Sequence, residues 1–487
     1  MPIYLIGMMG SGKTTLGNKL SKILNMSFID LDKEIEKIEN TTINNLFSKK
    51  GEEYFRNLES KVLKNTEAKN AIVATGGGII LRKENRLFLK NHKTIFLYVP
   101  VEDLIKRINP DNRPLLKDGK DRLYKIWDMR KALYNEFKKI DLSNLNIQES
   151  LAKILYEIID EKEEILENDF QEVIIKYKGL MDLKNKKYVF ASKNVYRIYR
   201  EFFNKPFLLK EGEEKKDYKN LEYIYQYLIE NEISRKDEIY GVGGGSVTDL
   251  TGFIGSTFKR GLDFYFYPTT LLSQIDASIG GKTGINFSKI KNVIGTFSIP
   301  EKVIIDPITI ISQDEKNYLS GIIEGFKIAI IDGNTSLFTE NIEKIKNRNL
   351  NILEKIIKYA AITKLKIVSK DPYDNNIRRL LNLGHTFGHG FESITGITHG
   401  LSVGWGIKKE IELFEDKIKE KDKKIILNFL KKILPEEIFK KDIPTEKLKN
   451  YIIQDKKINN NSIIDFPIIK SIGNVELEKI KITDIIK

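Results

Sequence analysis

The sequence contains no cysteine among its 487 residues, which excludes disulfide bonds, thiolate metal sites and cysteine nucleophiles. Histidine is also scarce, with four residues in the whole chain. No apolar run approaches the roughly 20 residues that a membrane-spanning helix needs, and the first ten residues lack the basic segment of a signal peptide. We therefore expect a cytoplasmic protein without a membrane partner.

Positive charge is in excess, because 81 Lys and Arg residues stand against 68 Asp and Glu residues and give a formal net charge of +13. Such an excess favours anionic partners. However, acidic residues are interspersed with the basic ones, and the sequence contains no aromatic platform or RNA-binding module. The charge thus predicts a solvated, Lys-rich surface and small anionic ligands rather than nucleic acid.

Short apolar runs alternate with charged segments of helical period, which predicts α/β domains with parallel sheets. The strand-like runs are residues 3–6, 28–31, 71–75, 94–99, 173–177, 188–191, 239–242, 264–267 and 303–306. Residues 151–167 have the pattern of a helix that runs out into acidic residues, and we place a domain junction there. After about residue 314, amphipathic helical patterns dominate until near the C-terminus. The predicted domains are residues 1–162, 163–313 and 314–487.

Residues 7–14 satisfy the pattern G-x-x-x-x-G-K-[ST] between an expected strand and an expected helix. In this pattern backbone N–H groups surround phosphate oxygens, Lys13 neutralises the β- and γ-phosphates, and the Thr14 hydroxyl binds Mg²⁺. The pattern predicts ATP and Mg²⁺ binding, and a chance glycine-rich turn is the alternative. The residues predicted to hold the nucleotide and its metal are Gly7, Gly10, Ser11, Gly12, Lys13, Thr14 and Thr15.

Two carboxylates, Asp30 and Asp32, follow at the end of the next expected strand. In phosphoryl transfer, one carboxylate can hold a water of the Mg²⁺ ion while the other accepts a hydroxyl proton. Alternatively, the pair caps the helix that follows. The spacing by itself leaves both interpretations open.

Further motifs follow at Gly51–Arg56, Thr75–Gly78, Asn112–Leu116 and Arg130–Tyr134. In this order and spacing, and together with the phosphate loop, they resemble shikimate kinase over nearly all of residues 1–160. The resemblance implies a P-loop kinase domain that phosphorylates shikimate to shikimate 3-phosphate. The shikimate-binding residues that it implies are Asp32, Arg56, Gly77, Gly78 and Arg130.

The same resemblance implies individual roles for several of these side chains. Asp32 would accept the proton of the reacting hydroxyl, and Asp30 would orient Mg²⁺ through water. Lys13 and Arg113 would stabilise the transferred phosphoryl group, Arg113 from a lid at about residues 109–119. Glu59 would brace Arg56.

A second glycine-rich turn, residues 243–245, again follows an expected strand and opens an expected helix. It is not the Rossmann fingerprint, because position 248 is threonine where that pattern requires glycine. Backbone amides at a helix N-terminus nevertheless suit a pyrophosphate. A tight structural turn is the alternative.

Three of the four histidines lie within residues 385–399. Neutral imidazole is a common Zn²⁺ ligand, and a catalytic zinc takes about three protein ligands. The spacing of four residues places His385 and His389 on one helix face, so spacing alone predicts these two as ligands. Two core histidines satisfied by backbone carbonyls are the alternative.

The surrounding motifs lie at Gly212–Lys216, Lys259–Gly261, Pro268–Leu272, Asp276–Gly284, Lys291–Asn292, Glu324–Lys327 and Asn382–His399. Taken together they resemble 3-dehydroquinate synthase over about residues 170–487. The resemblance implies an NAD-binding α/β domain followed by an all-α metal- and substrate-binding domain. It also implies the NAD⁺- and metal-dependent conversion of 3-deoxy-D-arabino-heptulosonate 7-phosphate to 3-dehydroquinate and phosphate, in a homodimer formed through this half.

The residues for each role in this half follow from the resemblance. The implied ligands of Zn²⁺ or Co²⁺ are Glu324, His385 and His399, which moves His389 from the metal to the substrate. The residues implied for NAD⁺ are Glu213, Lys216, Gly244, Gly245, Asp249, Thr269, Thr270, Lys282, Lys291 and Ser312. Those implied for the substrate are Arg260, Asp276, Lys282, Asn292, Lys327, Lys364, Arg378, Asn382, His389 and Lys456. Among these, the chemical steps would fall to Asp276, Lys282, Lys327 and His389.

We therefore expect a bifunctional enzyme with a shikimate kinase half and a 3-dehydroquinate synthase half. One alternative is another small-molecule P-loop kinase fused to a metal-dependent polyol dehydrogenase, which would consume NAD⁺ rather than regenerate it. A second alternative is a non-catalytic regulatory protein built on the same folds.

Overall fold

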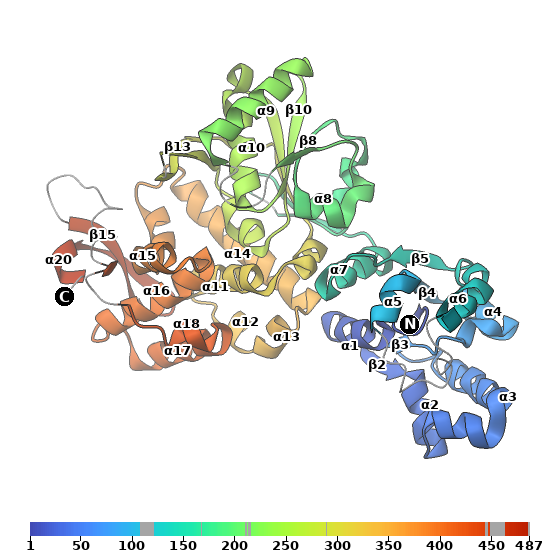
Figure 1. The fold of residues 1–487 in the computed structure, drawn as a ribbon. Coiled ribbons are helices and arrows are strands. Elements are labelled where there is room, and N and C mark those ends of the chain that lie inside the picture. The colour runs from blue at the N-terminus through green and yellow to red at the C-terminus, as the bar shows by residue number, and fades with distance from the viewer. Residues whose placement is uncertain are drawn as a thin grey trace. The chain divides into compact units, whose positions relative to one another are not determined.

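The computed structural model describes residues 1–107, 121–166, 168–209, 212, 216–288, 290–443, 447–448 and 463–485. Arg113, Glu213 and Lys456 lie outside these residues. The chain forms two compact units, Met1–Ile159 with Lys346–Leu350 and Asp160–Ile345 with Asn351–Lys487 (Figure 1). Each unit contains one large, mainly or wholly parallel sheet.

The first unit is built on a five-stranded parallel sheet with the order β2-β3-β1-β4-β5. Its strands are β1 (Ile3–Ile6), β2 (Ser27–Asp30), β3 (Ala71–Ala74), β4 (Lys93–Tyr98) and β5 (Lys138–Asp141). Its helices include α1 (Lys13–Leu24), α2 (Leu31–Glu39), α3 (Ile43–Lys64), α4 (Lys83–Lys90), α5 (Val101–Arg107), α6 (Asp121–Tyr134) and α7 (Ile147–Ile158), with the short turn η1 (Ile79–Leu81). Every residue of β1 and β3 is buried, as expected for inner strands of a covered parallel sheet.

This topology gathers the loops of the first unit at one edge. The segments that follow β1, β2 and β3 all leave the carboxyl ends of neighbouring parallel strands. The strand order reverses at β1, because β3 lies on one side of it and β4 on the other. Ligands of open α/β sheets bind at such a point, so the fold places the phosphate loop where a nucleotide is expected.

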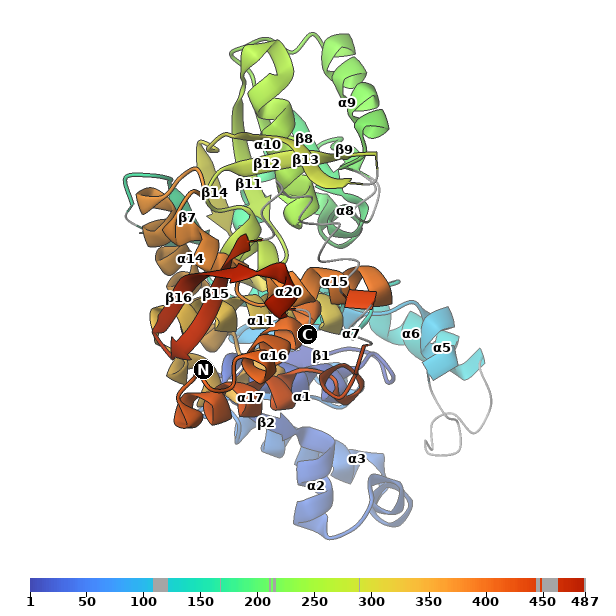
Figure 2. The same ribbon diagram turned by 90° about the vertical axis from the view of Figure 1, so that its left-hand side faces the viewer.

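The second unit contains a seven-stranded sheet with the order β6-β7-β14-β11-β10-β8-β9, in which only the edge strand β6 is antiparallel to its neighbour. The strands are β6 (Glu163–Leu166), β7 (Val173–Lys176), β8 (Tyr188–Ser192), β9 (Phe207–Leu209), β10 (Glu238–Gly243), β11 (Asp263–Pro268) and β14 (Lys302–Ile305). The helices of this part include α8 (Lys193–Tyr199), α9 (Tyr218–Glu230) and α10 (Gly245–Thr257), and helical turns lie at η4 (Gly179–Asn185), η5 (Arg200–Phe202), η7 (Phe258–Arg260), η8 (Ser273–Ala277) and η9 (Pro307–Ser312). A separate hairpin, β12 (Lys282–Phe287) and β13 (Ile290–Phe297), packs against α10 (Figure 2).

The remainder of the second unit is mainly helical. Its elements are α11 (Glu315–Asp332), α12 (Ser336–Thr339), α13 (Ile342–Lys346), α14 (Leu350–Lys370), η10 (Ile377–Asn382), α15 (His385–Thr395), α16 (His399–Leu413), α17 (Glu420–Ile433), α18 (Glu436–Phe439), β15 (Ile463–Ser471), β16 (Asn474–Lys481) and α20 (Ile482–Ile485). Helix α16 packs against both α11 and α15. The ring of Phe391 stacks on that of Trp405 with centroids 4.2 Å apart, which fixes the α15–α16 pair.

A strand forms at each of the nine apolar runs that the sequence analysis singled out. Two expectations are wrong in detail. Helix α7 ends at Ile158, and the acidic residues after it form β6, because β7 offers a free edge and Lys176 and Lys358 pair with Glu163 and Glu164. The segment after residue 314 is not purely helical, since β15 and β16 form an antiparallel hairpin.

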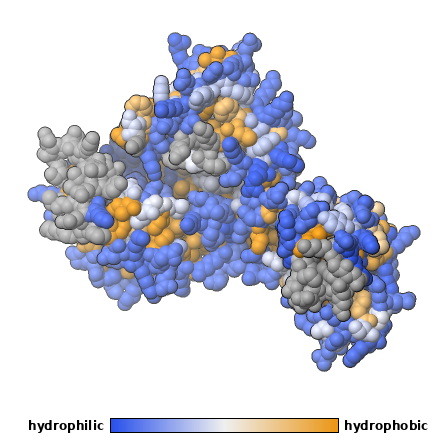
Figure 3. Space-filling view, viewed as in Figure 1, coloured by the Kyte–Doolittle hydropathy of each residue, from blue (hydrophilic) through white to orange (hydrophobic). Residues whose placement is uncertain are grey.

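The visible surface is dominated by hydrophilic side chains, with small apolar areas between them (Figure 3). Among the described residues, none of the helices is both long enough and apolar enough to cross a bilayer.

Candidate active sites

The phosphate loop wraps around the side chain of Lys13. Its ammonium donates hydrogen bonds to the carbonyls of Gly7 and Met8, at 2.8 and 2.9 Å. The buried hydroxyl of Ser11 has no hydrogen-bond partner among the described residues, and no side chain caps the N-terminus of α1. Backbone amides at this helix end, a lysine ammonium and a hydroxyl together fit a polyphosphate.

The structure separates the two carboxylates that the sequence left ambiguous. Asp30 is the N-cap of α2, where its Oδ1 accepts from the backbone of Asp32, and its Oδ2 accepts from the Thr14 hydroxyl at 2.7 Å. Asp32 lies beside Gly76, where a Cβ atom would come within 3.0 Å of its Oδ1. Asp30 therefore faces the phosphate loop as well as capping a helix, whereas Asp32 faces the segment after β3.

Two buried arginines meet at the glycine-rich segment after β3. The Arg56 guanidinium pairs with Glu59 at 2.7 Å and with Glu52 at 3.1 Å. A Cβ atom on Gly78 would lie 2.4 to 2.6 Å from the guanidinium of Arg56, so a side chain at this position would displace the guanidinium. Arg130 donates to the carbonyl of Gly77 at 2.8 Å. The two arginines therefore converge on one short segment.

Burial shifts the pKa values of the acidic and the basic groups around this segment in opposite directions. It raises the pKa of Glu59, which Arg56 only partly offsets. Burial also lowers the pKa of Arg130, whereas the ion pairs of Arg56 with Glu59 and Glu52 outweigh burial and raise the pKa of Arg56. A site with two such cations suits a carboxylate ligand.

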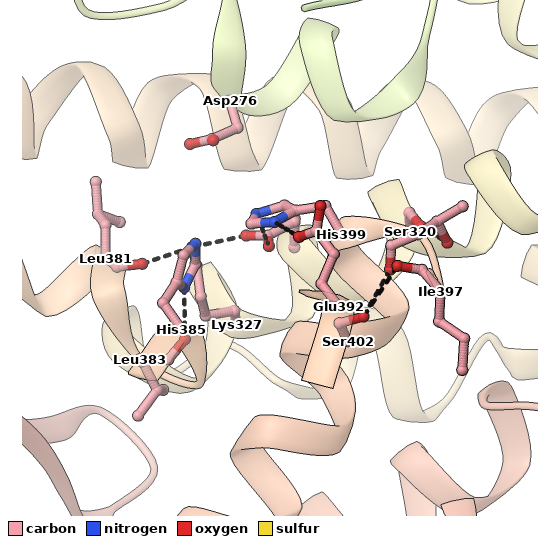
Figure 4. Close-up of polar contacts among 12 residues, drawn as sticks. Asp276, Ser320, Lys327, Leu381, Leu383, His385, Glu392, Ile397, His399 and Ser402 are labelled. Carbon is pink, nitrogen blue, oxygen red and sulfur yellow. Dashed lines mark hydrogen bonds and ion pairs between the residues drawn. The ribbon is translucent and has the colours of Figure 1, made fainter. Parts of the chain in front are cut away.

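The second unit brings four metal-ligand side chains together from three helices. The ligand nitrogens of His385, His389 and His399 all lie within 4.8 Å of one another. Nε2 of His399 is 3.5 Å from Oε1 of Glu324, which is 1% exposed on α11. Figure 4 shows His385 and His399 beside Lys327 and Glu392. The structure thus gathers both the pair that spacing predicted and the trio that the resemblance implied.

Ion pairs and burial set the protonation of this cluster. Burial lowers the pKa of His385 well below its usual value, which keeps its imidazole neutral. Burial also lowers the pKa of His399, but Glu392 and Glu324 outweigh it, and the net pKa is raised. Burial raises the pKa of Glu392, yet hydrogen bonds with His399 and Lys291 outweigh it and bring the pKa to about 2.

Lysine side chains surround the histidine cluster. Lys327 lies one turn beyond Glu324 on α11, and its ammonium is 2.6 Å from both the Glu324 carboxylate and the carbonyl of Leu381. Lys364 on α14 donates to the Asp276 carboxylate at 2.6 Å. Burial raises the pKa of Asp276, but Lys364 and Lys327 outweigh it and the net pKa is lowered. Asp276 is therefore an anion at neutral pH.

A second group of predicted residues lies near the N-terminus of α10. The buried Lys216 ammonium contacts Asp249 at 2.9 Å and also contacts Asn292. No side chain caps α10, whose N-cap is Gly244. A Cβ atom on Gly244 would lie 3.1 Å from Thr270, so the backbone approaches closely here.

The other predicted residues form contacts elsewhere or are exposed. Lys291 pairs with Glu392 at 2.7 Å, and Lys282 pairs with Asp374 at 2.5 Å. Arg260 and Asn382 are exposed. Thr269 donates its backbone N–H to the carbonyl of Gly243, and the Ser312 hydroxyl donates to the carbonyl of Thr309.

Comparison with known proteins identifies the family. Residues 9–162 match shikimate kinase, residues 206–320 match the N-terminal part of 3-dehydroquinate synthase, and residues 321–458 match its C-terminal part. A bifunctional shikimate kinase/3-dehydroquinate synthase of Thermotoga maritima is 44% identical over 480 residues, which cover 98% of this chain and 97% of the relative. The chain belongs to the bifunctional shikimate kinase/3-dehydroquinate synthase family.

Other relatives match the synthase part of this family. A 3-dehydroquinate synthase of Prochlorococcus marinus is 36% identical over 346 residues, which cover 68% of this chain and 89% of the relative. The structure of 2-epi-5-epi-valiolone synthase from Streptomyces hygroscopicus, solved with NAD⁺ and Zn²⁺, has a TM-score of 0.59 at 20% identity and covers 66% of this chain and 96% of its own. That structure shows the fold of the synthase unit.

The synthase family implies a divalent metal and NAD⁺, and the residues present fit both. Both carboxylate oxygens of Glu324 are buried and, among the described residues, accept no hydrogen bond, although Lys327 lies close. A carboxylate and imidazoles match the donor set of a catalytic zinc site. The uncapped N-terminus of α10 beside Lys216 matches the needs of a dinucleotide pyrophosphate.

The sequence analysis gave no role to Tyr134 and Gly76 in the kinase unit or to Glu392 in the synthase unit. The Tyr134 hydroxyl donates to the carbonyl of Gly77 at 2.6 Å, and Gly76 packs against Glu59 and Asp32. The position of Tyr134, four residues after Arg130 on α6, was a signal that both face one side. Glu392 bonds His399, and its place three residues after His389 offered the same signal.

Proposed function

We propose that this chain catalyses two reactions of aromatic biosynthesis, the ATP-dependent phosphorylation of shikimate and the conversion of 3-deoxy-D-arabino-heptulosonate 7-phosphate to 3-dehydroquinate and phosphate. The observation that carries this proposal is the presence of two chemically different groups of site residues in one chain. One is a phosphate loop beside two convergent arginines. The other is a buried carboxylate beside three imidazoles.

In the kinase unit, the loop amides and Lys13 hold the phosphates of ATP. Thr14 and Asp30, which already bond each other, would hold Mg²⁺ and its water, and a bound ion would supply positive charge beside the transferred phosphoryl group. Arg56 and Arg130 clamp the carboxylate of shikimate above the Gly77–Gly78 segment, and this orients the reacting hydroxyl. Asp32 then accepts the hydroxyl proton. Arg113 is assigned to the nucleotide by resemblance alone.

In the synthase unit, Glu324, His385 and His399 would hold the metal, and His389 would face the substrate. A bound metal would polarise the oxygen of the reacting alcohol, and bound NAD⁺ would supply the hydride chemistry. The neutral state of His385 leaves a nitrogen lone pair available as a ligand. Lys216, Asp249, Thr269, Thr270 and the N-terminus of α10 bind the dinucleotide.

The charged residues around the metal site position the substrate. Lys327, Lys364 and Arg378 supply positive charge for a substrate that carries phosphate and carboxylate. Asp276, held as an anion by Lys364, accepts a hydrogen bond from a substrate hydroxyl and orients it beside the metal. Lys282 and Asn292 close the site from the β12–β13 hairpin.

Two assays on the purified full chain test this proposal. Phosphate release from the heptulosonate should require NAD⁺, with no net NADH accumulation, and ADP formation should require shikimate. Lys13→Ala should lower the kinase rate at least about a hundredfold and leave the synthase rate unchanged. His385→Ala should have the reverse effect. Net consumption of NAD⁺ would instead favour a polyol dehydrogenase, and no turnover with either substrate would favour a regulatory protein.

We further propose that the synthase unit forms a homodimer in the cytoplasm and that residues 163–313 and 314–487 act as its two domains. The resemblance to 3-dehydroquinate synthase supports the dimer. Sedimentation equilibrium at micromolar concentration measures it directly, and a monomer mass would contradict it.

A further inference from the structure

A buried glutamine, Gln171, lies just before β7 and outside all three segments that match a known family. It is 3% exposed. Its Nε2 donates to the carbonyl of Ser278 at 3.2 Å, and its Oε1 accepts from the backbone N–H of Gly280 at 2.9 Å. One side-chain amide thus binds the backbone on both sides of residue 279, more than a hundred residues away in the sequence.

The segment that Gln171 holds connects two residues proposed to meet the substrate, Asp276 and Lys282. Gly280 and Gly281 both adopt left-handed backbone angles, with φ of 99° and 68°. Two consecutive glycines have a wide choice of backbone conformations, so contacts from outside the segment must select one of them. The hydrogen bonds of Gln171 make this selection at Gly280.

The conformation of Gly280 in turn sets the position of Arg378. The Arg378 guanidinium donates to the carbonyl of Gly280 at 3.0 Å and to the carbonyl of Pro372 at 2.7 Å. The packing is tight, because a Cβ atom on Gly280 would lie 2.7 Å from Nη2 of Arg378. A shift of the Gly280 peptide would therefore move the guanidinium.

Asp276 is anchored by a different route. Lys364 bonds both its carboxylate and its backbone carbonyl, at 2.6 and 2.5 Å, and does so from α14. Loss of the Gln171 hydrogen bonds would thus disturb Arg378, which donates to the carbonyl of Gly280, while Asp276 keeps its partner.

We infer that Gln171 is a positioning residue of the synthase site, which fixes the Ser278–Gly280 backbone and through it the Arg378 guanidinium that binds the anionic substrate. This inference rests on the proposed synthase function. Because Gln171 acts on binding groups and not on the group that orients the reacting hydroxyl, its loss raises the KM for the heptulosonate and leaves kcat nearly unchanged.

Two substitutions in the full chain test the inference. Gln171→Met has similar length but can neither donate nor accept, and we expect the KM for the heptulosonate to rise about tenfold with kcat within about twofold. Gln171→Glu keeps an acceptor for the Gly280 N–H, so its KM should rise less. The KM for NAD⁺ and both kinase constants should stay at their wild-type values.

Tyr318→Phe is the matched control, because it removes another buried hydrogen bond to a backbone carbonyl in the same unit, that of Ile345 at 2.6 Å. It should lower the thermal midpoint without changing the KM. If Gln171→Met does not fold, a rise of KM in Gln171→Glu still supports the inference. A wild-type KM in a folded variant overturns the inference and leaves the proposed function intact, whereas a wild-type chain that does not turn over the heptulosonate overturns both.

Discussion

At the scale of single residues, carboxylates that bond the proposed ligand-binding groups organise both sites. Neither Glu59 in the kinase unit nor Glu392 in the synthase unit is among the residues predicted to bind a ligand. Each nevertheless bonds a residue proposed to bind ligand, Arg56 in the first case and His399 in the second. Such second partners fix the direction in which a flexible cation or an imidazole ring points.

Glu59→Gln should weaken shikimate binding, because the amide cannot hold the buried Arg56 guanidinium with a full charge. We expect the KM for shikimate to rise about five- to tenfold. Steady-state kinetics at saturating ATP measure this change. Glu52→Gln is the control, since Glu52 pairs with the same arginine but its side chain is 58% exposed, and we expect less than about a twofold change. Equal effects of the two variants would contradict the role given to burial.

Glu392→Gln should weaken metal binding in the synthase unit, because the carboxylate that accepts from Nδ1 of His399 would become a neutral amide. Partners of this kind contribute about ten- to a hundredfold in metal affinity. Competition of the protein with a fluorescent zinc chelator measures the change without any enzyme assay. Glu415→Gln, which replaces an exposed carboxylate paired with Lys423, should leave the affinity unchanged.

At the scale of elements, the position of the histidine cluster depends on how α15 meets α16. Both helices start at a histidine, His385 and His399 respectively. Glu410 is buried on α16. Its carboxylate accepts a hydrogen bond at 2.9 Å from the backbone N–H of Gly384, the residue immediately before His385. The start of α15 is thereby fixed to the body of α16.

Glu410→Ala should destabilise the synthase unit by about 1–3 kcal/mol, because the buried N–H of Gly384 would lose this acceptor. Urea unfolding followed by the fluorescence of Trp405, in a chain that carries Trp127→Phe at its other tryptophan, measures the loss. Glu412→Ala lies on the same helix with a half-exposed side chain, and it should change the stability by less than about 0.5 kcal/mol. An equal loss of stability in Glu412→Ala would contradict the role given to Glu410.

At the scale of the whole molecule, the chain is divided into two compact units, each with its own large, mainly or wholly parallel sheet and its own proposed site. Each unit keeps the loops of its proposed site on its own elements. The two activities can therefore be stabilised, or lost, one at a time.

Ligands of one site should stabilise that unit alone. At a hundred times its Kd, a ligand stabilises the unit that binds it by about 2.7 kcal/mol. We expect shikimate with MgADP to raise one transition in differential scanning calorimetry, and NAD⁺ with Zn²⁺ to raise another. Lys13→Ala should abolish most of the first shift and none of the second. Movement of a single shared transition with either ligand set would contradict this prediction.

The sequence by itself determined the strands that the hydrophobic pattern marks and the motifs whose chemistry is local. The phosphate loop is such a motif, since all its groups lie within one turn between a strand and a helix. The sequence also named Glu324 as a metal ligand, but only through resemblance, because no spacing rule connects it to His385, which lies 61 positions further along the chain.

Only the tertiary structure decided the contacts between distant segments. It assigned Asp30 to the helix cap and the phosphate loop and Asp32 to the segment after β3, it brought Tyr134 to Gly77, and it placed Gln171 against Gly280. The tertiary structure also decided strand β6 and the β15–β16 hairpin, because strand pairing depends on which partner edge is present. A periodic sequence pattern indicates which individual residues are buried. These contacts depend instead on packing between residues that lie far apart in the chain.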